Sequence, residues 1–254
     1  MTASFYFVIN SSTPIGGDPY HGIMTAVDIV SNIANVQARI AAAELAAHRP
    51  SGSVQLLAVS KTKPADFVRV AAATGLRAFG ENYVQEGVDK ILALSDHGLV
   101  WHFIGPIQSN KTRLIAQHFD WVHCVDRGKI ARRLSEQRPT SLPPLNICLQ
   151  VNISQEATKA GLHPDEIAAV AAQIANLPNL VLRGLMAIPA PASSLEAQKR
   201  PLAALRELQE KLAVNHPTVD TLSMGMSADL EAAISEGTTM VRVGTDVFGS
   251  RQPI

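Results

Sequence analysis

The chain has 254 residues, long enough for one α/β barrel or for two ordinary domains. Lys plus Arg and Asp plus Glu number 22 each, so the formal net charge is zero, and no run of like charges points to nucleic acid as a main partner. Charged residues make up 17% and hydrophobic residues 46%, a composition typical of a large buried core.

Targeting and redox signals favour a cytoplasmic protein. No window reaches the ~18 consecutive apolar residues of a membrane span, and the opening MTASFYFVINSSTP lacks the basic flank of a secretory signal. Cys124 and Cys148 lie in strand-like segments without CxxC or Cys/His metal spacing. We therefore expect two buried free thiols, no metal site and no membrane contact.

Residues 1–23 differ in character from the rest of the chain. They are rich in Ser, Gly and Pro, show no lasting period, and end just before a second methionine, Met24. We expect an amino-terminal appendage here, either disordered or a leader segment, followed by a single domain over 24–254.

A long helix is predicted over 25–48. Apolar residues recur near helical spacing in an alanine-rich stretch, and Pro50 with Gly52 ends the pattern. The apolar positions that define this pattern are Val27, Val30, Ile33, Ile40 and Leu45.

Eight short apolar segments follow, separated by amphipathic ones. The predicted strands are VQLLAVS from 54, RAFG from 77, VWHFIG from 100, WVHCV from 121, LNICLQVNI from 145, LVLRGLMAI from 180, DTLSM from 220 and TMVRVG from 239. Helix-start signals between them include Pro64, Pro164 and Ser227.

Strict alternation of strand and helix requires parallel strands with right-handed crossovers. Eight such units close a barrel more naturally than they form an open sheet. The sequence therefore predicts a single-domain (β/α)8 TIM barrel with the amino-terminal helix packed on it, and a doubly wound sheet is the alternative.

Lys61 stands directly after the first predicted strand, on the same face as Leu57 and Val59. In a (β/α)8 barrel the loops after the strands build the active end. A lysine there is partly desolvated, which favours a neutral and nucleophilic amine. The alternative is that Lys61 and Lys63 only cap a strand at the solvent edge.

Arg242 lies inside the otherwise apolar strand TMVRVG. A guanidinium in such a position needs a partner, because an unpaired buried charge is costly. Two interpretations stay open. Arg242 either forms an ion pair with a loop carboxylate such as Glu81 or Asp246, or it donates to an acceptor atom of a ligand.

The ends of the seventh and eighth strands carry Gly225, Ser227, Gly244 and Thr245. Loops at these positions commonly form the phosphate site of this fold, through backbone N–H groups and a helix N-terminus. Plain capping of the following helix explains Ser227 equally well.

Together, six motifs resemble the pyridoxal-phosphate homeostasis proteins. They are AVSKTKP from 58, FGENYVQE from 79, WHFIGPIQSNK from 101, RGLMAIPAP from 183, SMGMS from 223 and RVGTDVFG from 242. The resemblance runs from about Ala26 to Arg251, with the motifs in order, and leaves residues 1–23 outside.

The resemblance implies an alanine-racemase-like barrel of fold type III that holds pyridoxal 5'-phosphate (PLP) as a Schiff base on Lys61. Carried over by position, Arg242 meets the pyridine nitrogen, and Ser227, Gly244 and Thr245 meet the phosphate. Asn82 lies in a matching loop. The implied role is storage, buffering or delivery of PLP in the cell by a protein without established turnover.

Arginine opposite the pyridine nitrogen disfavours a protonated ring and so weakens it as an electron sink. The sequence offers Tyr6, Tyr20 and Tyr83 as tyrosines, and His102, His123 and Cys124 as other candidate acid/base groups. A small PLP-dependent amino-acid racemase is the alternative function, and a class I aldolase-like enzyme using Lys61 without cofactor is a third. The expected partners are PLP and, transiently, apo PLP-dependent enzymes, and we expect a monomer.

Overall fold

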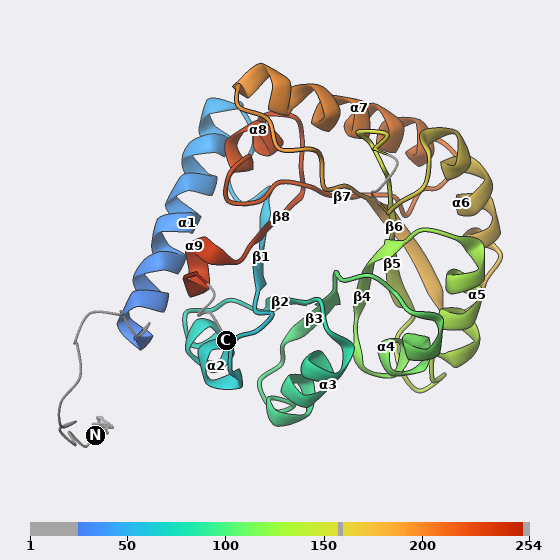
Figure 1. The fold of residues 1–254 in the computed structure, drawn as a ribbon, viewed down its shortest axis with the longest axis horizontal. Coiled ribbons are helices and arrows are strands. Elements are labelled where there is room, and N and C mark those ends of the chain that lie inside the picture. The colour runs from blue at the N-terminus through green and yellow to red at the C-terminus, as the bar shows by residue number, and fades with distance from the viewer. Residues whose placement is uncertain (1–24, 157–159, 251–254) are drawn as a thin grey trace.

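Figure 1 presents the computed structural model of the chain, which describes residues 25–156 and 160–250. Eight parallel strands are hydrogen-bonded in sequence order, and β1 also pairs with β8, so the sheet closes into a barrel. Helices surround this ring of strands (Figure 1). The predicted (β/α)8 barrel is confirmed, whereas the expectation for residues 1–23 lies outside the described residues.

The strands are β1 Gln55–Val59, β2 Ala78–Glu81, β3 Val100–Phe103, β4 Trp121–Val125, β5 Leu145–Gln150, β6 Leu180–Met186, β7 Thr221–Ser223 and β8 Met240–Val243. The helices are α1 Ala26–Ala46, α2 Ala65–Ala73, α3 Val84–Ala93, α4 Thr112–His118, α5 Gly128–Gln137, α6 Ile167–Ala175, α7 Leu195–Ala213, α8 Leu230–Ser235 and α9 Thr245–Phe248, with 3-10 turns η1 Ser109–Lys111 and η2 Pro164–Glu166. Each predicted strand overlaps one of the eight observed strands.

Helix α1 completes the outer ring of helices, between α2 on one side and α8 and α9 on the other. It begins with a capping box in which Thr25 and Asp28 exchange hydrogen bonds, and it packs against α2, α8 and α9 (Figure 1). Its buried face contains Ile29, Ile33, Val36 and Ile40.

The apolar residues whose spacing predicted this helix do not all lie on its buried face. Ile33 and Ile40 are buried as expected, but Val27, Val30 and Leu45 are exposed. The buried positions follow a spacing of three and four residues that leaves these three side chains off the stripe facing the barrel.

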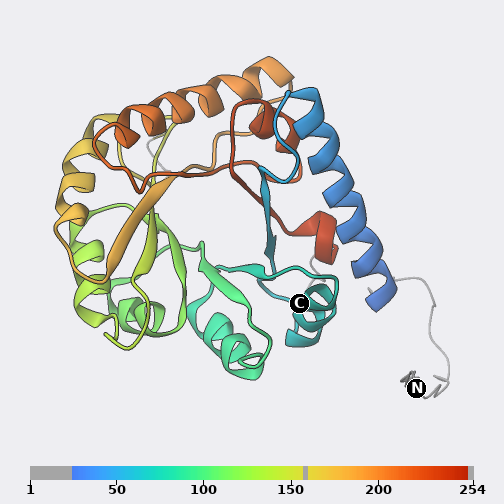
Figure 2. The same cartoon turned by 180° about the vertical axis from the view of Figure 1, so that it is seen from behind.

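The sheet has an apolar layer on each of its two faces. The large core lies between the strands and the helices and receives Leu56 and Ala58 of β1. A small separate cluster of Leu57, Ala78 and Met240 faces the other way, into the barrel, as the alternation of side chains along a strand requires. Figure 2 shows the same ring of strands from behind.

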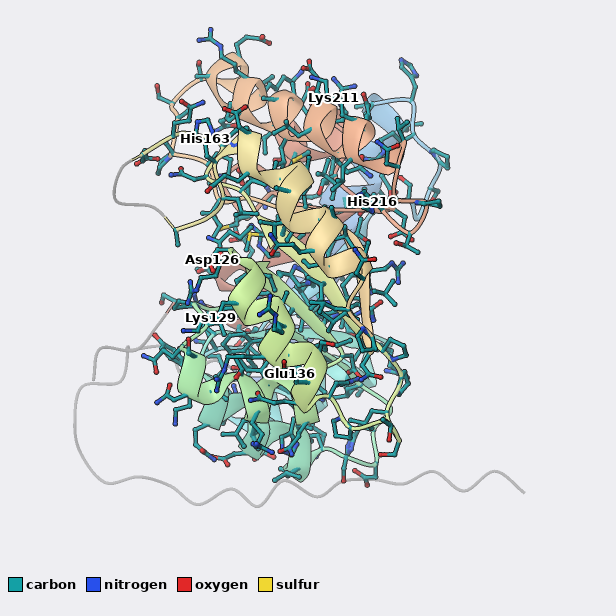
Figure 3. All side chains as sticks on the ribbon, turned by 90° about the vertical axis from the view of Figure 1, so that its right-hand side faces the viewer. Asp126, Lys129, Glu136, His163, Lys211 and His216 are labelled. Atoms are coloured by element: carbon teal, nitrogen blue, oxygen red, sulfur yellow. The ribbon has the colours of Figure 1, made fainter. Side chains whose placement is uncertain are left out.

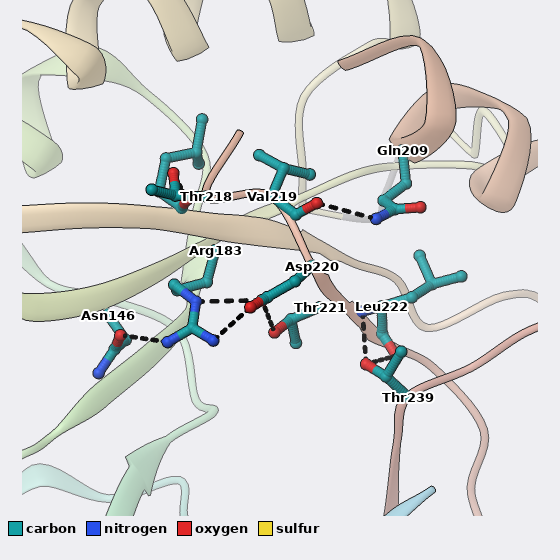
Figure 4. Close-up of polar contacts among 10 residues, drawn as sticks. Asn146, Arg183, Gln209, Thr218, Val219, Asp220, Thr221, Leu222 and Thr239 are labelled. Atoms are coloured by element: carbon teal, nitrogen blue, oxygen red, sulfur yellow. Dashed lines mark hydrogen bonds and ion pairs between the residues drawn. The ribbon is translucent and has the colours of Figure 1, made fainter. Parts of the chain in front are cut away.

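The amino-terminal end of the barrel is closed by polar contacts. Arg183 donates to both carboxylate oxygens of Asp220 and to the side-chain oxygen of Asn146 (Figure 4). Its guanidinium carbon also lies 4.9 Å from the ring centre of Trp121.

The carboxyl ends of the strands lie at the opposite end. Figure 3 shows Asp126 and His163, which follow β4 and β5, at one end of the barrel and His216, which precedes β7, at the other. Among the described residues no helix is long and apolar enough to cross a membrane.

Candidate functional site

Lys61 follows β1 after one further residue, the fully buried Ser60, and is itself half-buried. The next residue, Thr62, has a φ of 62°, in the left-handed region that β-branched residues rarely adopt. The chain therefore turns sharply at the carboxyl end of β1, and Lys61 lies in that turn.

Arg242 is buried in the wall of β8 and is 5% exposed. It is paired in register with Leu57 and lies two residues after Met240, and both of these face the inside of the barrel. Its guanidinium donates to the carbonyl and hydroxyl oxygens of Ser223, at 2.6 and 2.7 Å, and to the carbonyl oxygen of Ala187 at 2.9 Å.

The ion-pair interpretation of Arg242 is wrong for both carboxylates considered. Glu81 pairs with Lys90, and Asp246 pairs with Arg39. Within residues 25–156 and 160–250, no carboxylate lies in ion-pair contact with Arg242. Burial lowers the pKa of Arg242 to about 10, and the charge of Asp229 opposes that shift.

Two histidines continue the polar contacts of Arg242 across the barrel interior. His123 Nδ1 lies 2.9 Å from Ser223 Oγ, and His123 Nε2 lies 2.9 Å from His102 Nδ1. Burial lowers the pKa of His102 to about 3 and that of His123 well below its usual value. Both imidazoles are therefore neutral at ordinary pH. Sequence reasoning treated them as single residues and missed the chain that joins them to Arg242.

The loops after β7 and β8 lie side by side because their strands pair. Helix α8 begins at Leu230, two positions later than the capping interpretation of Ser227 requires, and Asp229 is its N-cap residue. The Asp229 carboxylate instead accepts from the backbone N–H of Met226 at 2.6 Å. Ser227 is half-buried and Thr245, the first residue of α9, is exposed.

Arg39 of α1 ties these two loops together, and sequence reasoning missed it. Its guanidinium donates to the Ser227 carbonyl at 3.0 Å, to Asp246 at 2.7 Å and to Glu231 at 2.9 Å. No local signal could identify this role, because each partner lies at the other end of the chain.

Asn82 directly follows β2, so it also lies at the carboxyl end of the strands. Among the described residues its side-chain oxygen is buried without a hydrogen-bond partner. The chain approaches it closely at Gly105, where a Cβ would lie 2.1 Å from the Asn82 carbonyl oxygen.

The remaining candidate groups offer little reactivity. Cys124 and Cys148 are free and buried, as predicted, and burial raises the pKa of Cys148 to about 12. In the part of the chain that the structure describes, no three His, Cys, Asp or Glu side chains gather in a way that could hold a metal ion.

A surface cavity of about 400 Å³ lies away from all of these groups. It is formed between α1 and the first residues of β1 and β2, and Gln37, Glu44 and Arg77 are among its lining residues. It contains none of the six predicted site residues.

Five of the six predicted site residues follow β1, β2, β7 or β8, and Arg242 lies within β8, one residue before its carboxyl end. The closed barrel of eight parallel strands, with its surrounding helices, is a barrel of the alanine racemase type. Consistently, the family described as "Alanine racemase, N-terminal domain" matches residues 31–252. Alanine racemase from Corynebacterium glutamicum shares this fold at a TM-score of 0.63 and 19% identity, over 90% of this chain and 62% of that one.

Closer relatives define the family within that class. The pyridoxal phosphate homeostasis protein of Pseudomonas aeruginosa is 61% identical over 223 residues, covering 88% of this chain and 96% of the relative, and that of Escherichia coli K12 is 52% identical over 227 residues, covering 88% and 97%. PipY of Synechococcus elongatus, solved with PLP bound, matches at a TM-score of 0.76 and 37% identity, over 87% of this chain and all of that one. The chain belongs to the pyridoxal phosphate homeostasis protein family, which confirms the resemblance in the motifs.

Proposed function

We propose that this protein binds PLP at the carboxyl end of its barrel and serves in storage, buffering or delivery of the cofactor. The observation that carries the proposal is Arg242, a buried cation that the described chain provides with neutral partners alone. A carboxylate would satisfy a structural arginine more completely. A guanidinium left without one is suited to an acceptor atom of a ligand.

The residues at this end fit the cofactor. PLP needs an amine for its aldehyde, a donor or acceptor at its pyridine nitrogen and an anion site for its phosphate. Lys61 supplies the amine and Arg242 the donor. The unpartnered Asn82 oxygen is a buried polar atom that a ligand would satisfy.

Each residue has a distinct role in this proposal. Lys61 holds the cofactor as a Schiff base, and Arg242 donates to the pyridine nitrogen. Gly244 and Thr245 bind the phosphate through the first N–H groups of α9, which have no acceptor within the helix, and Ser227 offers its hydroxyl group. When bound, PLP would supply an aldehyde that condenses with an amine, with loss of water. It would also supply a ring that draws electron density from the carbon–nitrogen bond so formed.

The surroundings favour a carrier over a catalyst. Arg242 keeps its proton at ordinary pH and cannot accept another, which disfavours protonation of the ring nitrogen. His102 and His123 are sealed in the barrel as neutral groups, and burial raises the pKa of the Cys124 thiol. A racemase, the alternative function, requires an acid/base group on each face of the substrate.

The test is to load the purified protein with PLP, record its absorbance, and reduce it with sodium borohydride. We expect an imine band and a pyridoxyl group on Lys61 after peptide mapping. Lys63, which donates to the Ser250 carbonyl at 2.9 Å, provides the matched control. Lys61→Ala should abolish the band and Lys63→Ala should retain it. A protein that stays colourless with added PLP overturns the proposal.

We further propose a monomer that acts in the cytoplasm and meets apo PLP-dependent enzymes transiently. The two buried free thiols suit a reducing compartment. Light scattering during gel filtration tests the monomer. Mixing loaded protein with an apo-enzyme and following recovery of that enzyme's activity tests delivery, and incubation with single amino-acid enantiomers tests for racemase turnover.

A further inference from the structure

A buried charged cluster lies between the barrel wall and α3, beside the turn that carries Lys61. The Lys90 ammonium donates to Glu81 Oε1 and to Glu86 Oε1, at 2.7 Å each. The side chains of Lys90 and Glu81 are 6% and 0% exposed, and that of Glu86 is 27% exposed. We refer to Glu81, Glu86 and Lys90 as the Lys90 cluster.

The cluster holds the chain on both sides of Lys61. Lys90 donates to the carbonyl oxygen of Ser60 at 2.7 Å, and the Ser60 hydroxyl donates to Glu81 Oε1 at 2.6 Å. The backbone N–H of Thr62 donates to Glu86 Oε1 at 2.5 Å. The two peptide groups that flank Lys61 are therefore tied to the same three side chains.

The bond from Thr62 to Glu86 fixes an unfavourable backbone conformation. Thr62 has a φ of 62°, where its branched side chain crowds the backbone. Such a conformation persists only where the surroundings determine it. Glu86 accepts from the amide of that very residue, so the cluster holds the turn together with the backbone bond from the Lys63 N–H to the Ser60 carbonyl.

Stability alone does not account for the cluster. Desolvation of buried ion pairs offsets much of their attraction, so they are weak evidence for stabilisation. Among the described residues, Glu81 Oε2 has no hydrogen-bond partner, which adds to the cost. What these hydrogen bonds do is fix the backbone on both sides of Lys61.

We propose that the Lys90 cluster positions Lys61 for its reaction with PLP, by locking the two flanking peptide groups and the left-handed turn at Thr62. The inference rests on the proposed function, since it concerns the link between Lys61 and the cofactor. Glu81, Glu86 and Lys90 are positioning residues in this scheme, because they act through the backbone and touch no cofactor.

The test compares Glu86→Ala with Glu86→Gln in the full-length apo protein. The alanine variant loses the acceptor for the Thr62 amide, and we expect imine formation at Lys61 to slow by about tenfold to a hundredfold, the usual effect of a misplaced reactive group. The glutamine variant keeps an acceptor oxygen and should load within about threefold of wild type, because a neutral acceptor retains most of the geometry.

Two further measurements separate positioning from folding. The double variant Glu86→Ala with Thr62→Gly should recover part of the loading rate, because glycine adopts the left-handed conformation without steric cost. In apo protein, the Thr62 amide resonance should move upfield in Glu86→Ala and stay near its wild-type position in Glu86→Gln. If the alanine variant does not fold, Glu86→Asp, which keeps the charge but shortens the side chain, should show the same slow loading.

Asp220→Asn provides the control for general loss of an ion pair, since it weakens the contact with Arg183 at the other end of the barrel. We expect it to load at the wild-type rate. Loading of folded Glu86→Ala at the wild-type rate overturns the positioning role while leaving the proposed function intact. Absence of an imine band in wild type overturns the proposed function, and the positioning role with it.

Discussion

Arg242 is the residue on which the chemistry of the proposed site depends most. Its described partners are oxygen atoms of Ser223 and Ala187, so its charge is not neutralised by contact. Nη1 donates two of these bonds and Nη2 the third, so the bonds fix the plane of the guanidinium. The carbonyl oxygens therefore orient the Arg242 guanidinium. Because no carboxylate contacts it among the described residues, its positive charge can interact with a ligand.

Arg242→Gln should lower PLP affinity by about tenfold to a hundredfold, because a hydrogen bond from a charged donor contributes roughly 1.5–3 kcal/mol. It should also shift the absorbance band, since the ring nitrogen can then take a proton. Titration of apo protein with PLP, followed by absorbance, measures both effects. Ser223→Ala is the control, because it removes a neutral partner and keeps the charge. A folded Arg242→Gln variant with wild-type affinity and spectrum would remove Arg242 from the site.

The buried histidines give the protein a defined acid sensitivity. The folded-state pKa values of His102 and His123 lie below those of the unfolded chain, about 6.5. The unfolded chain therefore binds more protons as the pH falls through about 6.5, and the stabilising effect of neutral histidine is lost below that value. For His102 the loss continues to a pH of about 3.

We expect the free energy of unfolding to fall by up to about 1.4 kcal/mol per pH unit for each histidine below pH 6.5. Urea unfolding between pH 7 and pH 5 measures this slope. His102→Asn should flatten it, because the asparagine does not titrate. Titration of either imidazole near pH 6.5 in the NMR spectrum of folded protein would contradict this account.

Helix α1 contributes to the proposed site although it precedes the barrel in the chain. Through Arg39 it connects the Ser227 loop with Asp246 of α9. The arginine side chain is 36% exposed, so solvent reduces the strength of its ion pairs. Its effect on the proposed site is therefore mainly geometric, in that it links the Ser227 loop to the start of α9.

Arg39→Met should weaken PLP binding by about threefold to tenfold while imine formation at Lys61 persists, because a partly exposed ion pair contributes at most about 1 kcal/mol. Arg69→Met is the matched control, since Arg69 pairs with Asp66 within the surface of α2. Equal affinities for PLP in the two variants would show that the contacts of Arg39 do not affect cofactor binding.

The two faces of α1 differ in their effect on stability. Ile33 is buried against the barrel and Val30 is 47% exposed. Ile33→Ala should lower the free energy of unfolding by about 2–4 kcal/mol, since it removes buried methyl groups and leaves a cavity. Val30→Ala should change it by less than about 0.5 kcal/mol. Denaturant unfolding of both variants checks the assignment, and similar losses would contradict it.

Elements that depend on a local sequence pattern could be predicted from the sequence. Strands such as WVHCV were recognisable because burial on both faces makes a short apolar run, a property of the segment itself. The start of α8 was not, because Ser227 carries a local capping signal that the turn between Met226 and Asp229 overrides. The location of Lys61 followed from its place after a strand. The roles of Arg39 and of His123 depend on partners far along the chain, which no local pattern reveals.

At the scale of the whole molecule, the barrel interior departs from the aliphatic layers usual for this fold. His102 and His123 occupy it together with Ser223 and Arg242, and the His102 ring stacks on Trp121 at 5.3 Å. The aliphatic cluster of Leu57, Ala78 and Met240 is small by comparison. This polar interior has a defined hydrogen-bond pattern, which gives the end of the barrel near Arg242 a rigid base.

Deletion of residues 1–23 should leave PLP binding and the melting temperature unchanged. The capping box of α1 is formed by Thr25 and Asp28, so the shortened chain keeps the start of its first described helix. Thermal unfolding and PLP titration of the two lengths check this. A large fall in melting temperature would show that the segment stabilises the barrel.

The pairing of β1 with β8 also has a consequence for protein synthesis. Among the described strands, Lys61 follows the first to leave the ribosome and Arg242 lies in the last, and these two strands are neighbours in the closed barrel. A nascent chain that lacks β8 has neither the arginine nor the loop of Gly244. In the proposed site, capture of the cofactor therefore requires a chain that has been made as far as β8, since a chain interrupted earlier lacks both Arg242 and Gly244.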